Sequence, residues 1–106
     1  MPLNPAELIQ QNQHEYTISG AVDFLTAPAL VQTSLDFFKG YKSAETVTVD
    51  LSKVSSCNSA GLALMLEMVK NAQKNNITLR FENLPDTLLT IAKAYGVEKE
   101  IRDICK

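Results

Sequence analysis

Three side chains of this sequence could act as a nucleophile or a base: Cys57, Ser59 and His14, the only histidine. Cys57 and Ser59 fall where we expect a loop to end and a helix to begin. The positive end of a helix lowers the pKa of a thiol and favours bound anions. A catalytic cysteine also needs a base, and His14 lies far away in a polar stretch, where a surface role is expected. Because free cysteines are usually buried, the pattern favours a small core residue over a Cys57 nucleophile.

The rest of the sequence lacks the motifs that most enzymes need. It contains only four glycines, no phosphate-binding loop, and no His, Cys or acidic residues at the spacing of metal ligands. Its spaced acids are typical of a solvated surface and not of an acid/base pair; they are Glu67, Glu82, Asp86, Glu98 and Glu100. We therefore expect no catalytic residue, no cofactor and no metal site.

Ser59 has two possible roles at the start of its helix. Its oxygen could accept a hydrogen bond from a free backbone N–H, as serine helix caps commonly do. Alternatively, it could stay exposed at the positive end of the helix, where it would face a partner or carry a phosphate. The residues alone favour the capping role.

Composition limits the class of protein. The 106 residues carry a net charge of −2, without a basic stripe, and 7% are aromatic, with no tryptophan. A nucleic-acid surface is therefore not expected. The N-terminus lacks the basic and apolar regions of a signal peptide, and the longest apolar run, Leu62 to Leu66, is too short to span a bilayer. With only Cys57 and Cys105 as thiols, the pattern indicates a reducing, cytoplasmic compartment and membrane association only through a partner.

The hydrophobic periodicity predicts strands that alternate with helices. The expected strands are Ala6 to Gln11, Glu15 to Val22, Thr46 to Leu51 and Ile77 to Phe81, with a loop from Ser52 to Asn58. The expected helices run from a Thr26 cap to Gly40, from Ser59 to Lys74, from Pro85 to Gly96 and from Lys99 to Cys105. The order β-β-α-β-α-β-α-α predicts an α/β fold in which helices pack against a mixed sheet. We assign residues 1–106 to one domain.

Helical spacing identifies the side chains that should face the core. In the central helix, the predicted stripe is Leu62, Met65, Leu66, Val69 and Ala72. Tyr95 is predicted to be buried at the end of the third helix. Leu64 and Met68 lie off the stripe, so they either pack on a neighbouring helix or form an exposed apolar ridge for a partner. Phe37 raises the same question on the first helix.

Two separated motifs resemble the signature of the STAS family. Asp50-Leu-Ser-Lys-Val54 is followed by Asn58-Ser-Ala-Gly-Leu62, and an earlier segment, Ser19-Gly-Ala-Val-Asp23, resembles the sequence that precedes the first helix of that family. The resemblance covers nearly the whole chain. It implies a STAS-type mixed sheet and a non-catalytic module that docks another protein around Ser59. The family usually has Asp where this chain has Asn58, which weighs against phosphorylation of Ser59.

Further segments resemble one branch of the family, the small standalone STAS subunit of the Mla phospholipid ABC transporter. They are Gly61 to Leu66, Ile77 to Leu79 and Thr90 to Val97. This resemblance implies an accessory subunit at the cytoplasmic face of the inner membrane of a Gram-negative bacterium, bound to the ATPase subunit of the transporter. The residues expected to bind the partner are Asn58, Ser59, Ala60, Gly61, Leu64 and Met68.

Two other functions remain open at this point. The family also contains anti-sigma factor antagonists, which implies an alternative in which phosphorylation of Ser59 controls binding to an anti-sigma factor kinase. A small enzyme with a Cys57 nucleophile is a weaker alternative, for which rapid labelling of Cys57 at neutral pH would be required.

Overall fold

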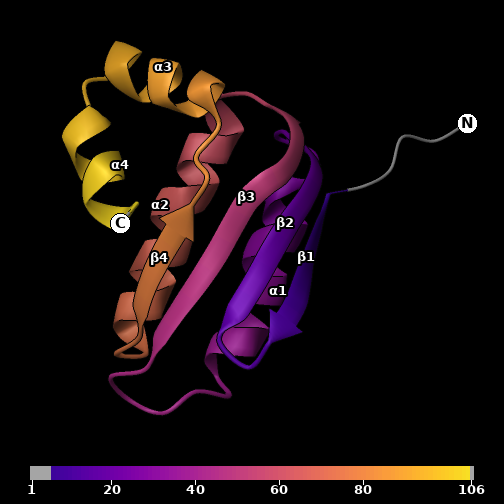
Figure 1. The fold of residues 1–106 in the computed structure, drawn as a ribbon, viewed down its shortest axis with the longest axis vertical. Coiled ribbons are helices and arrows are strands. Elements are labelled where there is room, and N and C mark those ends of the chain that lie inside the picture. The colour runs from indigo at the N-terminus through magenta and orange to yellow at the C-terminus, as the bar shows by residue number, and fades with distance from the viewer. Residues whose placement is uncertain (1–5, 106) are drawn as a thin grey trace, which may run out of the picture.

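The computed structural model describes residues 6–105, which form four strands and four helices in the order expected from the sequence. Residues 1–5 and 106 of the predicted domain lie outside the described residues. Figure 1 shows the elements, which are β1 (Glu7–Asn12), β2 (Glu15–Val22), α1 (Ala27–Phe38), β3 (Thr46–Cys57), α2 (Ser59–Lys74), β4 (Thr78–Glu82), α3 (Asp86–Ala94) and α4 (Glu98–Ile104). The predicted α/β class with a mixed sheet is confirmed.

The four strands form one sheet in the order β1-β2-β3-β4. β1 pairs with β2 in antiparallel fashion, whereas β2, β3 and β4 run parallel to one another. Because parallel neighbours need a crossover connection, α1 joins β2 to β3 and α2 joins β3 to β4. The carboxyl ends of β2 and β3 therefore meet at one end of the sheet, where the Asn58 N–H donates to the Val22 carbonyl over 3.4 Å.

α1 and α2 lie behind the sheet in the view of Figure 1 and cover one of its faces. Strand residues that point toward them are apolar and buried, among them Val47, Val49, Leu79 and Phe81. Their neighbours along the strands point to the other face and are polar, as the alternating burial of β4 shows. This pattern is the period of two expected for a sheet with one solvated face.

β3 is longer than predicted, because the segment expected to be a loop from Ser52 to Asn58 continues the strand as far as Cys57. Its pairing with β2 shifts register twice, between Thr17 and Ser19 and again between Gly20 and Ala21. Each shift inserts one extra residue of β3. The inward-facing residues Val54 and Cys57 are therefore three positions apart, and not two as in a regular strand. Gly20 lies at the second shift, and its φ of +94° is a conformation that glycine adopts without steric cost.

α2 has the predicted bounds but a different buried face. Leu66, predicted to be in the core, is 39% exposed, whereas Leu64 and Met68 are only 3% and 1% exposed. The question left open by the sequence is thus answered for these two residues: their side chains belong to the core, because α2 packs against α1 on one side and α3 on another. Phe37 is half-buried and packs on the ring of Tyr16, with the ring centroids 4.7 Å apart.

The predictions about the helix ends are only partly correct. Thr26 is the N-cap residue of α1, as expected, but its side chain makes no capping bond, and the residue that caps the other end of α1 is Lys39, not Gly40. Tyr95, which was expected to be buried, is exposed and lies just after the end of α3. The predicted stops after α2 and α3 are confirmed, since Asn76 and Gly96 both adopt the left-handed conformation that ends helices.

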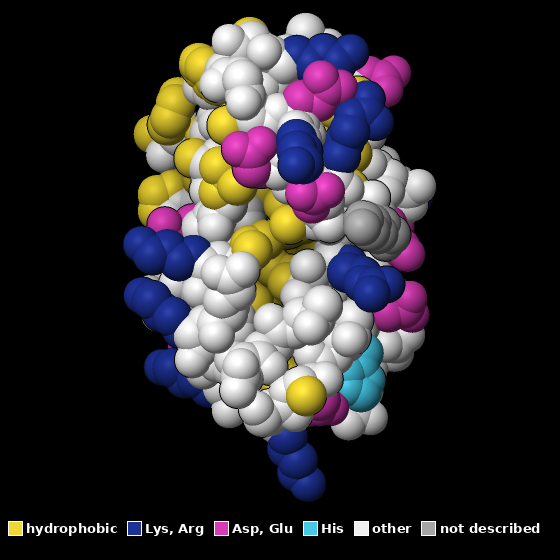
Figure 2. Space-filling model, turned by 90° about the vertical axis from the view of Figure 1, so that its left-hand side faces the viewer, with side chains coloured by type: hydrophobic (Ala, Val, Ile, Leu, Met, Phe, Trp, Pro, Cys, Tyr) yellow, Lys and Arg dark blue, Asp and Glu magenta, His cyan; other side chains and the backbone are white. Residues whose placement is uncertain are grey.

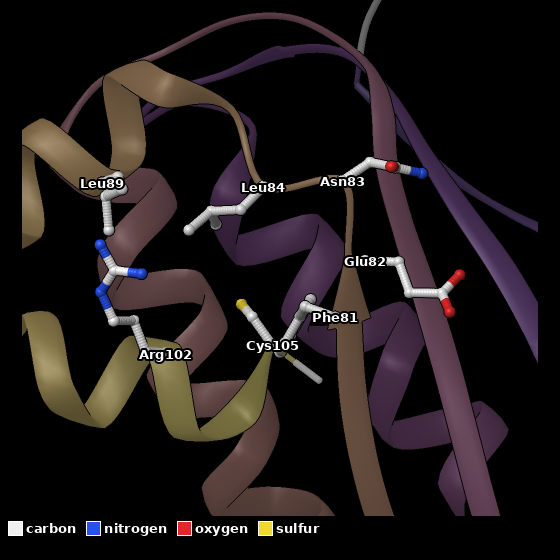
Figure 3. A pocket seen from close by; sticks show the side chains of 7 residues that line it. All are labelled: Phe81, Glu82, Asn83, Leu84, Leu89, Arg102 and Cys105. Atoms are coloured by element: carbon white, nitrogen blue, oxygen red, sulfur yellow. The ribbon is translucent and has the colours of Figure 1, made fainter.

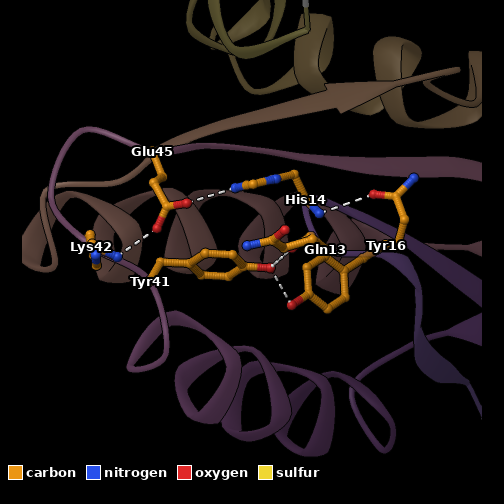
Figure 4. A network of polar contacts seen from close by, with 7 residues as sticks. Gln13, His14, Tyr16, Tyr41, Lys42 and Glu45 are labelled. Carbon is orange, nitrogen blue, oxygen red and sulfur yellow. Dashed lines mark hydrogen bonds and ion pairs between the residues drawn. The ribbon is translucent and has the colours of Figure 1, made fainter.

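A polar cluster at the other end of the sheet joins the β1–β2 turn to the connection between α1 and β3 (Figure 4). His14 Nε2 lies 2.7 Å from Glu45 Oε1, and Glu45 Oε2 accepts a bond from the Lys42 N–H over 2.6 Å. The hydroxyls of Tyr16 and Tyr41 are also hydrogen-bonded to each other. The sequence suggested a surface role for His14. In the structure, its side chain is half-exposed and also holds the β1–β2 turn against Glu45.

We expect Glu45→Gln to make stability less dependent on pH. The hydrogen bonds from His14 and from the Lys42 N–H hold the pKa of the Glu45 carboxyl below its usual range. A depressed pKa stabilises the folded state above the unfolded pKa, and this stabilisation is lost as pH falls through the folded pKa. The free energy of unfolding in urea should therefore differ between wild type and variant at pH 7, and this difference should be smaller at pH 3. Glu67→Gln is the control, and an equal difference at both pH values would contradict this expectation.

Candidate partner-binding surface

Asn58, and not Ser59, caps the central helix. The Asn58 side chain accepts a hydrogen bond from the Ala60 N–H over 2.8 Å, while its own backbone is extended. Ser59 is the first residue of α2, is half-exposed, and its hydroxyl makes no hydrogen bond with any described residue. The capping role favoured by the residues alone is therefore wrong for Ser59. The Asn found in place of the usual Asp supplies the oxygen that caps the helix, which leaves the Ser59 hydroxyl available to a ligand or partner.

We expect Asn58→Ala to lower the free energy of unfolding by about 1 kcal/mol, the typical worth of a side-chain cap. Asn58→Asp is the matched control, because aspartate caps helices about as well as asparagine. Urea unfolding followed by circular dichroism measures both variants. Equal stability of the alanine variant and wild type would show that the bond to the Ala60 N–H contributes nothing.

The small residues that follow Ser59 pack inside the molecule. Ala60 and Gly61 are both buried. A Cβ added to Gly61 would lie 3.1 Å from a methyl carbon of Leu88 and 3.4 Å from the Cys57 Cβ. Gly61 therefore lets α3 of the same chain approach α2. Of the six residues predicted to bind a partner, only Asn58 and Ser59 have accessible side chains; Ala60, Gly61, Leu64 and Met68 are buried.

The turn between β2 and α1 lies beside the start of α2 and exposes two large apolar side chains. Phe24 is 68% exposed and Leu25 is 91% exposed. Asp23 and Thr26 fix this turn reciprocally. Asp23 Oδ1 accepts from the N–H groups of Leu25 and Thr26 over 2.8 and 3.0 Å, and Thr26 Oγ1 accepts from the Asp23 N–H over 3.0 Å. The Thr26 hydroxyl also donates to the Ala21 carbonyl over 2.9 Å.

A shallow apolar groove of about 240 Å³ runs from this turn between α1 and α2. It is lined by Phe24, Ala27, Pro28, Val31, Ala60, Ala63, Leu64 and Glu67. Phe24 and Leu25 are not among the site residues predicted from the sequence. One sequence signal could have identified them. Asp23 and Thr26 have side chains typical of a turn, and the two residues between them are large and apolar.

A larger hollow of about 630 Å³ lies between the end of β4, α3 and α4 (Figure 3). Leu84 and Cys105 point into it, and the Arg102 guanidinium reaches over it toward Leu89. Arg102 is already paired with Glu98 over 2.8 Å. On this side of the molecule, Figure 2 shows hydrophobic side chains in a central hollow, with charged side chains of both signs above it.

The two thiols are poor candidates for nucleophilic chemistry. Cys57 and Cys105 are both free and half-buried, and burial raises the pKa of each thiol. A raised pKa lowers the fraction of reactive thiolate at neutral pH. Burial thus weighs against Cys57 as a nucleophile.

Within residues 6–105, no helix combines the length and the apolar character needed to cross a membrane.

Comparison with known proteins identifies the family. A model of the MlaB STAS domain matches residues 8–104. The chain is 40% identical over 55 residues to the intermembrane phospholipid transport system binding protein MlaB of Escherichia coli K12, and equally similar to that of Shigella flexneri. The aligned part covers 50% of this chain and 55% of each relative, so the chain spans about half the length of the curated relatives it matches.

Two solved structures share the fold. The anti-sigma factor antagonist SpoIIAA in its unphosphorylated form aligns with a TM-score of 0.67 and 14% identity, over 89% of this chain and 83% of SpoIIAA. A sulfate transporter family protein from Wolinella succinogenes aligns with a TM-score of 0.63 and 16% identity, over 90% of this chain and 75% of the other. The family match over residues 8–104, on a fold with this strand order, shows that the chain belongs to the STAS domain family, in its MlaB branch.

Proposed function

We propose that this chain is a non-catalytic accessory subunit that binds the ATPase subunit of a phospholipid-transporting ABC system at the cytoplasmic face of the inner membrane. The observation that carries the proposal is the accessible Asn58–Ser59 turn, in which the Ser59 hydroxyl is left free because Asn58 caps the helix. The likeness to phospholipid transport system binding proteins supports the choice of partner. Docking at this turn would support the ATPase without any chemistry on this chain.

Reconstitution tests this function directly. The chain is co-expressed with the ATPase subunit of a phospholipid-transporting ABC system from the same host, and the mixture is separated by size-exclusion chromatography. We expect a stable complex, and we expect the ATPase to lose stability or turnover when the chain is omitted. Failure of the two purified proteins to associate at micromolar concentration would overturn the proposal.

A second candidate is an anti-sigma factor antagonist controlled by phosphorylation of Ser59. The observation that favours it is the free Ser59 hydroxyl at the positive end of a 16-residue helix. A phosphate there would add nearly two negative charges and repel or attract a partner. Mass spectrometry of the protein from its host separates the two candidates: a stoichiometric phosphate on Ser59 would favour the antagonist, and unmodified Ser59 the accessory subunit.

A further inference from the structure

Phe24 and Leu25 have large apolar side chains that are exposed and do not belong to the core. At 68% and 91% exposure they are the most exposed of the large apolar side chains among the described residues. The hydrogen bonds of Asp23 and Thr26 fix the backbone of their turn at both ends. Apolar side chains on a fixed turn lose little freedom when they bind, so they are suited to be anchors of an interface.

The groove next to this turn has the shape that accepts a helix. Its walls are the first halves of α1 and α2, which pack side by side. Ala27 and Ala63 have small side chains, which allow the backbone of an incoming helix to come close, whereas Phe24 lines the groove on the side of the turn. A volume of about 240 Å³ fits one large apolar side chain, the usual anchor of helix-in-groove recognition.

The other end of the groove carries an uncompensated charge. Glu67 lines the groove, is exposed, and forms no ion pair with any described residue. Glu67 lies seven positions after Ala60 in α2, about 10 Å along the helix axis at 1.5 Å per residue. A partner that buries an apolar side chain beside Phe24 would therefore place a basic residue about two helical turns further on, opposite Glu67.

We propose that the Phe24–Leu25 turn and this groove bind an amphipathic helix of the ATPase subunit, which carries a large apolar residue and, two turns away, a lysine or arginine. This inference rests on the proposed function and extends its surface from the Asn58–Ser59 turn across α1. The turn anchors the helix by apolar contact, and Glu67 fixes its direction, because reversing the helix would remove the basic residue from the carboxylate.

The test measures the affinity of four variants for the purified ATPase subunit by isothermal titration calorimetry. Phe24→Ser is expected to weaken binding by about 30-fold or more, the loss typical of an interface anchor. Glu67→Lys is expected to weaken it by about 10-fold and to invert the salt dependence of this contact, because salt screens the new repulsion between two basic residues. Tyr95→Ser and Glu100→Lys are the controls, since they remove another exposed ring and reverse another exposed charge outside the groove. Both controls should bind as the wild type does.

The outcomes separate this inference from the function on which it rests. If the wild type binds the ATPase and Phe24→Ser binds equally well, the groove assignment is overturned while the proposed function stands. If the wild type forms no complex, both fall. A photoreactive residue at position 25 should crosslink to a helix of the ATPase. A dimer of the isolated chain that dissociates on Phe24→Ser would instead assign the groove to a second copy and overturn the proposal.

Discussion

Ser59→Glu is expected to weaken the complex with the ATPase subunit by about 30-fold or more, equivalent to about 2 kcal/mol. The new carboxylate would have to lose water inside the interface without a positive partner. Folding should not suffer, because a negative side chain in the first turn of a helix interacts favourably with its dipole. Calorimetric titration measures the affinity, and urea unfolding confirms that α2 is intact.

The matched control for this charge is Thr46→Glu. Thr46 is exposed at the start of β3, at the opposite end of that strand from Ser59. The same charge placed there should leave the affinity unchanged. If Ser59→Glu binds as tightly as Thr46→Glu, the assignment of the Ser59 turn to the interface is wrong.

Phe81→Ala is expected to have the largest effect on stability, a loss of about 3–5 kcal/mol in the free energy of unfolding. Phe81 lies in β4, is 0% exposed, and belongs to the core between the sheet and the helices. Small domains have only about 5–15 kcal/mol of stability in total, so the variant should unfold at much lower urea. The same substitution at the exposed Phe24 should cost less than about 0.5 kcal/mol.

The two phenylalanines should therefore separate folding from binding. Urea unfolding should reveal a large loss only for Phe81→Ala, and the titration should reveal a large loss of affinity for Phe24→Ala while the fold is retained. A stability loss of similar size in both variants would mean that the Phe24 turn supports the core.

Much of the fold could be predicted from the sequence because its elements have strong local signals. Alternating β-branched residues from Thr46 to Leu51 correctly predicted a strand, and helical spacing correctly predicted α2. The ends of α2 and α3 were also predicted close to Asn76 and Gly96, which adopt the left-handed conformation. These features depend on residues close together in the chain.

What could not be predicted depends on contacts between distant residues. The extension of β3 to Cys57 requires two register shifts in its pairing with β2. These shifts interrupt the period of two, so the hydrophobicity pattern of β3 alone does not predict them. The buried face of α2 is wide because two helices cover it, so spacing alone placed Leu66 inside and left Leu64 undecided. The exposure of Phe24 and Leu25 follows from the Asp23–Thr26 clamp, which a hydrophobicity pattern does not contain.

The position of β1 has a consequence for how the protein avoids aggregation. β1 is an edge strand, so its outer row of backbone groups has no strand partner within the described chain. Such an edge can recruit an identical strand and seed fibrils. Four of its six side chains are charged or amide-bearing: Glu7, Gln10, Gln11 and Asn12. A register irregularity between Gln10 and Asn12 also distorts the ladder. Polar side chains and a distorted edge both discourage such pairing, so this edge of the sheet is a poor template for a second copy of the strand.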